Sequence, residues 1–331
     1  MANRIPIIPI FLPHLGCPHR CVFCNIKSAF GAENVIKPDG LKNLLTKVCK
    51  KHDTKIEVAL YGGTFTALPE KDIKAYLSAV ADGCGDKLSH IRVSTRPDYI
   101  NGRVLGILKD SRVKIIEIGV QSFDDRVLEI INRGHTAEDS FKAVKMAKGA
   151  GFTTGVQLMF GLPGETSTSF KETVKKTIRL KPHMVRIHPT IVLKGSELEK
   201  WYREGRFKPL EVNRAVEWGL FAYKKFRNAG ITVHRIGLSS GPTIDTSVVA
   251  GPYKPAFGEM VLSGYMRDKL EEILSAEVES SIVKVRVPSP LLSQYIGYKK
   301  ENIRYFYNKY GINVIISADN ELSGDEVVFE L

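Results

Sequence analysis

The chain has 331 residues, of which 43% are hydrophobic, so it can bury the core of one large domain and a small one. Its formal net charge of +12 favours an acidic partner, nucleic acid first among them, although a basic enzyme without such a partner would carry the same charge. No apolar run approaches the roughly 20 residues that span a bilayer, so we expect no membrane partner.

A loop with three cysteines is the most informative stretch of the chain. An apolar run over residues 5–12 predicts a buried strand, and Cys17, Cys21 and Cys24 follow it directly. Soft thiolates at this compact spacing suit an iron–sulfur cluster. A four-iron cluster held by three thiolates keeps one iron open, and an open metal position is typical of a site that binds a substrate.

The remaining two cysteines have neither the paired spacing nor the close histidines of a zinc site. Cys49 lies beside the apolar face of a helix predicted over residues 39–52, and we interpret it as a core residue. Cys84 stands alone in the sequence. Five cysteines in so long a chain do not predict a disulfide framework, and thiols that must stay reduced place the protein in the cytoplasm.

Strands and helices alternate through the first two thirds of the chain. The predicted strands cover residues 5–12, 55–61, 91–94, 115–120, 153–160 and 184–188. The predicted helices cover residues 39–52, 99–109, 136–150, 167–180 and 211–229, with one more beginning near residue 69. Six strand–helix units in succession predict an α/β fold with a parallel sheet, curled as an open, partial TIM-like barrel. The active site of such a fold lies at the carboxyl ends of its strands.

Glycines and polar residues lie at the ends of several predicted strands. They are Gly62, Gly63 and Thr64 after the second strand, Ser94 in the third, Gln121 after the fourth and Gln157 in the fifth, with Arg133 a little further along. Glycine lets a ligand approach the main chain closely, a glutamine can hydrogen-bond a ribose, and an arginine can pair with a carboxylate. A tight turn and a helix cap are the plain structural alternatives for the glycines and for Arg133.

The cysteine loop, with Phe23 just before its last cysteine, resembles the Cys-x3-Cys-x2-Cys motif of the radical S-adenosylmethionine (SAM) enzymes. This resemblance implies a [4Fe–4S] cluster on Cys17, Cys21 and Cys24, SAM bound to the fourth iron, and an electron donor such as flavodoxin or ferredoxin. The implied SAM contacts are Phe23, Gly62, Gly63, Thr64, Ser94, Gln121, Arg133 and Gln157. The sequence indicates no catalytic residue.

Longer stretches of the sequence indicate which radical SAM families the chain resembles. The run from Gly119 to Thr136 is similar to one shared by oxygen-independent coproporphyrinogen oxidases and the catalytic subunit of the elongator complex. The segment Gly161 to Thr166 matches another shared stretch, whose backbone lies beside the adenosine in those families. Residues 94–98 and 189–198 favour the elongator subunit, whose radical SAM domain we expect over residues 5–235. This chain is too short for the acetyltransferase domain of that family, so we do not extend acetyl-CoA chemistry to it.

The C-terminal residues do not continue the alternation of strands and helices seen in the first two thirds of the chain. A strand over 282–287, a short helix, a turn over 297–300, a second helix and strands over 312–317 and 326–330 resemble a KH module, whose GxxG loop clamps a nucleic-acid backbone. Lys300 replaces the second glycine of that loop. The expected RNA contacts are Lys284, Arg286, Gly297, Tyr298, Lys299, Lys300 and Arg304, with Tyr295, Tyr305, Phe306 and Tyr307 available to stack on bases. The alternative is an ordinary amphipathic helix with solvated lysines.

We therefore predict a radical SAM domain over residues 1–235, a capping extension or linker over 236–275 and a small α+β, KH-like domain over 276–331. The function that fits best is a radical SAM enzyme that modifies RNA, either tRNA or rRNA. Two alternatives stay open at this point. One is a small-molecule oxidoreductase resembling coproporphyrinogen oxidase, and the other is a noncatalytic iron–sulfur protein that binds RNA.

Overall fold

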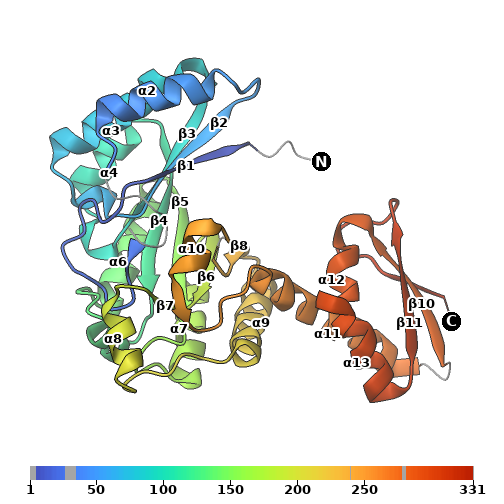
Figure 1. Ribbon diagram of the computed structural model, residues 1–331. Helices are drawn as coiled ribbons and strands as arrows, with labels where there is room; N and C mark the ends of the chain where they lie inside the picture. The colour runs from blue at the N-terminus through green and yellow to red at the C-terminus, as the bar shows by residue number, and fades with distance from the viewer. Residues whose placement is uncertain (1–4, 27–34, 239, 278–280, 331) are drawn as a thin grey trace.

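The computed structural model describes residues 5–26, 35–238, 240–277 and 281–330. Seven parallel strands form one open, curled sheet in the order β1-β2-β3-β4-β5-β6-β8, with β1 and β8 at its two edges (Figure 1). These strands are β1 (Ile7–Phe11), β2 (Ile56–Tyr61), β3 (Leu88–Thr95), β4 (Val113–Gln121), β5 (Thr153–Phe160), β6 (Met184–Pro189) and β8 (Thr232–Ile236). The predicted partial barrel is confirmed, and β8 is a seventh strand that the sequence did not reveal.

Helices cover the outer face of this sheet and connect its strands. They are α2 (Pro38–Cys49), α3 (Glu70–Cys84), α4 (Gly102–Lys109), α5 (Asp125–Ile130), α6 (Ala137–Gly149), α7 (Ser167–Leu180) and α9 (Val212–Asn228). All of them except α5 place an apolar stripe on the sheet, which is why the sequence predicted these six. At the start of α6, Thr136 and Asp139 form a reciprocal capping box that satisfies two backbone N–H groups.

Smaller elements lie between β6 and the C-terminal third of the chain. They are β7 (Val192–Leu193), α8 (Glu197–Arg203), α10 (Pro242–Ser247) and β9 (Val248–Ala250), and β7 pairs with β9 in a short antiparallel ladder. Among the helices of the described residues, none combines the length and the apolar character needed to cross a bilayer.

The structure pairs Cys49 with Cys84 as a disulfide between α2 and α3, which the sequence did not predict. Both cysteines are buried among the apolar side chains of the barrel core, as expected for Cys49. The three cysteines of the loop are free.

The C-terminal part is a small α+β domain with its own core. Its three-stranded sheet contains β10 (Ile282–Pro288), β11 (Asn313–Asp319) and β12 (Val328–Glu330), with β10 parallel to β11 and antiparallel to β12. The helices α12 (Leu292–Ile296) and α13 (Glu301–Tyr310) pack against this sheet. The predicted small domain is confirmed, while its assignment as a KH module stays a prediction.

A single helix, α11 (Phe257–Glu277), joins the two parts (Figure 1). Its first half contributes Phe257 and Val261 to the barrel core, and its second half contributes Met266, Leu270 and Leu274 to the small core. The helix therefore runs across the predicted domain boundary at residues 275 and 276. The domain limits themselves stay predictions.

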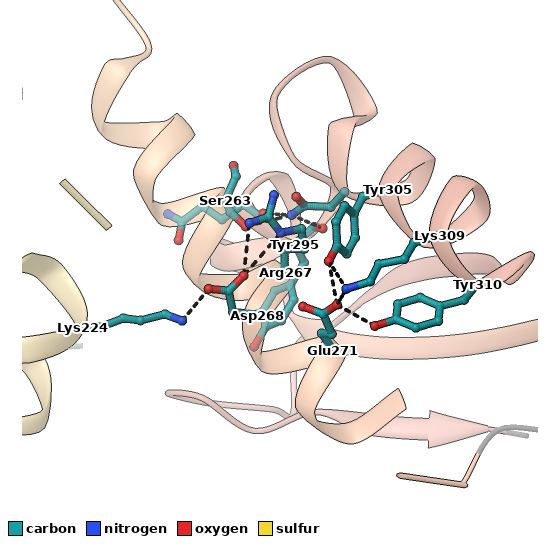
Figure 2. Close-up of polar contacts among 11 residues, drawn as sticks. Lys224, Ser263, Arg267, Asp268, Glu271, Tyr295, Tyr305, Lys309 and Tyr310 are labelled. Carbon is teal, nitrogen blue, oxygen red and sulfur yellow. Dashed lines mark hydrogen bonds and ion pairs between the residues drawn. The ribbon is translucent and has the colours of Figure 1, made fainter. Parts of the chain in front are cut away.

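Polar contacts add to this junction (Figure 2). Asp268 of α11 accepts hydrogen bonds from Lys224 of α9 and from Arg267. The carboxylate of Glu271 accepts hydrogen bonds from Tyr305 and Tyr310, each at 2.6 Å, and from Lys309. These contacts fix α13 against α11 and α11 against the barrel.

Candidate active site

A cavity of about 710 Å³ opens at the carboxyl ends of the barrel strands. All three loop cysteines and all eight residues that the sequence linked to SAM line it. They are Cys17, Cys21, Phe23, Cys24, Gly62, Gly63, Thr64, Ser94, Gln121, Arg133 and Gln157. The structure thus brings together residues from β3, β4 and β5 and from three loops, and their roles toward a ligand remain proposals.

The cysteine loop is held on one side by the Gly-Gly-Thr segment after β2. Backbone hydrogen bonds join Leu12 to Tyr61 at 2.7 Å and Thr64 to Leu15 at 2.8 Å. A Cβ atom on Gly63 would overlap the carbonyl oxygen of Leu15 and lie 3.0 Å from that of Leu12. Gly63 is therefore required by the close approach of the cysteine loop itself. The sequence suggested the approach of a ligand or a tight turn.

On its other side the loop is tied to the segment that precedes α6. The amide of Val22 donates to the carbonyl of Ile131 at 3.1 Å, and the side chain of Asn132 donates to the carbonyl of Arg20 at 3.0 Å. The ring of His19 packs so closely on Gly134 that a Cβ atom there would clash with it. The run Asn132-Arg133-Gly134 therefore holds the cysteine loop in place, in addition to supplying the Arg133 side chain to the cavity.

Arg133 and Gln121 meet beside Cys21. The Arg133 guanidinium donates to the carbonyl of Gly119 at 2.5 Å and to the Sγ of Cys21 at 3.4 Å. This approach needs glycine at position 119, because a Cβ atom would lie 2.8 Å from Arg133 and 2.9 Å from Gln121. Gln121 has a φ of 68°, which is uncommon for a residue other than glycine and turns its side chain at the end of β4.

This end of the cavity fits the cofactors that the sequence implies. Among the described residues, Gln121 Oε1 and Arg133 Nε are buried and have no hydrogen-bond partner, as expected of groups that bind a polar ligand. The three thiols face the same cavity, and thiolates are the usual ligands of iron–sulfur clusters. Burial, together with the neighbouring Cys21 and Cys17, raises the pKa of the Cys24 thiol to about 12. Within the described ranges, no group of three or more His, Cys, Asp or Glu side chains is arranged to hold a single metal ion.

A charged network of Glu57, Arg92, Glu117 and Arg186, which we call the floor of the cavity, contributes Glu117 and Arg186 to the cavity lining. Arg92 of β3 bridges two carboxylates, donating to Glu57 of β2 and to Glu117 of β4, the latter at 2.5 Å. Glu117 in turn lies 3.0 Å from Nε of Arg186 on β6, whose guanidinium also donates to the Tyr61 hydroxyl at 2.8 Å. Four strands are thereby linked inside the barrel. This network was not predicted from the sequence, although charged residues inside otherwise apolar strands were a signal for it.

Two ionisable groups near the floor have strongly altered pKa values. Burial alone would raise the pKa of Glu57, but hydrogen bonds from His90 and Arg92 outweigh it and lower the pKa to about 2. Burial and the charge of Arg186 lower the pKa of His188 to about 4, so this histidine is neutral at pH 7. Its Nδ1 lies 2.9 Å from the carbonyl of Gly237, which can only accept, so Nδ1 carries the proton and Nε2 is an acceptor.

The residues proposed to contact RNA lie in two places in the small domain, on the strand β10 and around the turn after α12. Lys284 and Arg286 lie on β10, and Arg286 pairs with Asp319 at 2.6 Å. The turn after α12 carries Lys299 and Lys300, both exposed and both with left-handed φ values of 52° and 62°. The remaining members are Gly297, Tyr298 and Arg304, with Tyr298 exposed and Arg304 donating to the carbonyl of Lys299.

The buried amide of Asn302 fixes the start of this turn. Its Nδ2 donates to the carbonyls of Ser263, Gln294 and Tyr295 at 2.9–3.1 Å. The same side chain packs against Gly297, where a Cβ atom would clash. The turn is therefore a fixed structure that presents two lysines to solvent.

The aromatic residues of this region are mostly structural. Tyr295 and Phe306 are fully buried, so the expectation that they stack on bases is wrong. Tyr305 donates to Glu271 and packs between Arg267 and Phe306. Aromatic spacing alone could not separate these two uses, because a small core needs large apolar side chains. Tyr298 and Tyr307 are exposed.

Comparison with known proteins agrees with this geometry. The chain is 28% identical over 311 residues to the tRNA uridine(34) acetyltransferase of Methanocaldococcus infernus. The alignment covers 81% of this chain and 57% of that relative. The structure of the archaeal Methanocaldococcus infernus Elp3 is similar in fold, with a TM-score of 0.63 and 23% identity over 81% of this chain and 64% of that one. The Escherichia coli coproporphyrinogen III oxidase HemN, a radical SAM enzyme, has a TM-score of 0.53 and 20% identity over 69% of this chain and 54% of its own.

Family models match most of the barrel. The Radical_SAM C-terminal domain matches residues 182–267. The radical SAM superfamily model matches residues 11–177, which include the last residue of β1, the cysteine loop and β2 to β5. This second match spans half of the chain, and this protein therefore belongs to the radical SAM superfamily.

Proposed function

We propose that this radical SAM enzyme modifies RNA, and that tRNA is the first substrate to test. The observation that carries the proposal is the pairing of two features in one chain. One is a cavity that gathers three free cysteines with Gln121 and Arg133, and the other is a small domain that presents Lys299 and Lys300 on a fixed turn. The relative named a tRNA uridine(34) acetyltransferase supports an RNA substrate, although this chain spans little more than half of its length.

The residues around the cavity suggest how the cofactors would be held. Cys17, Cys21 and Cys24 would hold a [4Fe–4S] cluster, and Arg133 and Gln121 would meet the carboxylate and ribose of SAM. When bound, the cluster would supply the electron for reductive cleavage of SAM to a 5′-deoxyadenosyl radical. The chain contributes positioning and shelter from water. The electron donor would be a small redox protein such as flavodoxin or ferredoxin.

The small domain supports the RNA part of the proposal through charge. Lys299 and Lys300 are exposed at neighbouring positions, and Lys299 lies 5.5 Å from the ring of exposed Tyr298. Lysines can meet phosphates while an exposed aromatic ring stacks on an unpaired base. Both lysines have a left-handed backbone conformation, which favours glycine. Lysine at these positions therefore carries backbone strain, which is consistent with a functional role for the charged side chains.

Comparing ribonucleosides from a gene-deleted strain and its parent tests the activity. We expect mass spectrometry of digested tRNA to show one modified nucleoside that is lost on deletion and restored by the wild-type gene but not by Cys21→Ala. Ribosomal RNA is digested separately as the second candidate. Unchanged profiles in both fractions would refute RNA modification and favour a small-molecule substrate.

Binding of RNA is tested independently with purified protein. Lys299→Asn combined with Lys300→Asn removes both charges and keeps residues that tolerate a left-handed backbone. We expect weaker tRNA binding and a salt dependence whose logarithmic slope falls by about 1–2, as loss of two phosphate contacts predicts. The matched control replaces the exposed lysines Lys142 and Lys175 of the barrel by Asn. Equal weakening in both variants would contradict a specific role for the turn.

A further inference from the structure

The imidazole of His188 has one ring nitrogen bound to the backbone and the other accessible from the cavity. His188 lies on β6, lines the cavity and is only 8% exposed. Its Nδ1 donates to the carbonyl of Gly237 at 2.9 Å, which leaves Nε2 as an acceptor. Among the described residues none donates a hydrogen bond to Nε2, and this atom is not fully enclosed by protein.

We propose that Nε2 of His188 accepts a hydrogen bond from the ring N–H of a uracil or guanine base that enters the cavity. This inference rests on the proposed function, because the base would belong to the RNA nucleotide that is modified. In this role His188 is a residue that positions the substrate and selects its base.

The backbone around the ring holds the acceptor in one orientation. The amide of Gly237 donates to the carbonyl of Ile187 at 2.9 Å, while the carbonyl of Gly237 accepts from His188. Gly237 has a φ of 78°, and a Cβ atom there would lie 3.1 Å from the ring of Phe257 on α11. The carbonyl that fixes the histidine is therefore itself fixed. An acceptor held in this way loses little entropy when it binds a ligand.

The charge state of the ring also suits an acceptor. Burial and the nearby charges of Arg186 and Arg235 lower the pKa of His188 to about 4, so Nε2 keeps its lone pair at pH 7. Arg186, two residues earlier on the same strand, donates to the Tyr61 hydroxyl at 2.8 Å and lies 3.0 Å from Glu117. Its guanidinium is therefore engaged at the floor of the cavity.

The side chains around His188 favour a flat base with a ring N–H. Met159 is its neighbour across the pairing of β5 and β6, and Ile191 and Leu193 line the same cavity just after β6. Apolar neighbours can pack on the faces of a base, and a hydrogen bond sheltered from water is stronger. Uracil and guanine carry a donor at the ring nitrogen of the Watson–Crick edge. Adenine and cytosine carry an acceptor there, which would oppose the lone pair of Nε2.

The test compares two pairs of probes for binding to the full-length, reconstituted, SAM-bound protein under anaerobic conditions. The pairs are uridine with 3-methyluridine and guanosine with 1-methylguanosine, and in each pair the methyl group replaces the ring N–H. A buried acceptor that loses its hydrogen bond lowers affinity by about 5- to 100-fold. We therefore expect the wild type to prefer the unmethylated nucleoside by at least about 5-fold in one of the pairs.

Two variants separate recognition of the base from a structural role. His188→Asn keeps an amide that can donate to Gly237 but has no acceptor at the position of Nε2. It should weaken binding of the preferred nucleoside by about 5-fold or more and abolish the preference. His188→Gln keeps a carbonyl oxygen near the position of Nε2 and should retain the preference. A merely structural role would weaken both nucleosides of a pair equally in both variants, which would overturn the proposal.

His183→Asn is the matched control, since His183 precedes β6, is exposed and lies outside the cavity. It should leave the preference unchanged. Equal affinities within both pairs, no measurable binding of any probe, or a preference that survives His188→Asn would also overturn the proposal. A preference lost in His188→Asn and kept in His188→Gln, in a protein whose deletion changes no RNA nucleoside, would keep the role of His188 and refute the RNA substrate.

Discussion

Arg92 holds two buried carboxylates in the floor of the cavity, and replacing it measures what that floor contributes to stability. The pKa of Glu57 is about 2, below its usual value of 4.5, because hydrogen bonds from His90 and Arg92 outweigh the effect of burial. A shift of this size corresponds to about 3 kcal/mol of stability. Since the folded-state pKa is depressed, this stability is present above pH 4.5 and is lost as the pH falls toward 2.

We expect Arg92→Met to lower the free energy of unfolding by about 3–5 kcal/mol at pH 7, because it leaves Glu57 and Glu117 buried without their shared partner. Urea unfolding followed by circular dichroism measures this at pH 7 and at pH 4. The loss should shrink at pH 4, because in the variant Arg92 no longer lowers the pKa of Glu57, and the carboxyl can take up a proton there and lose its need for a cationic partner.

The matched control is Arg103→Met. Arg103 also pairs with a glutamate, Glu70, but its side chain is 82% exposed, so we expect a loss of at most about 1 kcal/mol. Similar losses in the two variants, or a loss in Arg92→Met that does not shrink at pH 4, would refute the reasoning.

Three further predictions concern other parts of the site. Gly63→Ala should displace the cysteine loop. It should therefore lower the amount of iron bound after anaerobic reconstitution and lower the free energy of unfolding by about 1–3 kcal/mol. The control Gly106→Ala has open space around the new methyl group and should bind iron normally. Burial raises the pKa of Glu165 to about 8, so the wild type should lose stability as the pH rises from 4.5 to 8. Glu165→Gln should remove this pH dependence of stability, measured by thermal unfolding between pH 5 and 9. An equally steep pH dependence in the variant would contradict the prediction. Asn302→Ala should cost about 1–3 kcal/mol, because three buried carbonyls lose their donor, while exposed Asn308→Ala on the same helix should cost almost nothing in the same denaturant titration.

The parts of the fold that follow one periodic pattern could be predicted from the sequence. The strands β1 to β6 are short apolar runs, and the residues at their carboxyl ends line one cavity because parallel strands meet at one edge. The helix α11 could not be predicted in this way. Its apolar residues change face between Val261 and Met266, because its two halves pack in different cores.

The inner wall of the barrel was also hidden from sequence reasoning. The strand β6 reads as a short apolar run, and the alternation of Arg186 and His188 within it is too brief to indicate which face is polar. The closeness of Arg186 to Tyr61 depends on how strongly the sheet curls between β2 and β6, which no local pattern encodes.

The helix shared by the two cores has a consequence for how such a chain can change over evolution. Residues of α11 complete the barrel core at one end and the small core at the other, so neither part can be exchanged as an independent module at a boundary within the helix. A chain that lost the segment after Glu277 would expose Met266, Leu270 and Leu274 to water and would invite aggregation. A recombined gene would have to keep α11 together with α13, whose Tyr305 and Lys309 bind Glu271, so we expect the two parts to be exchanged only as one unit.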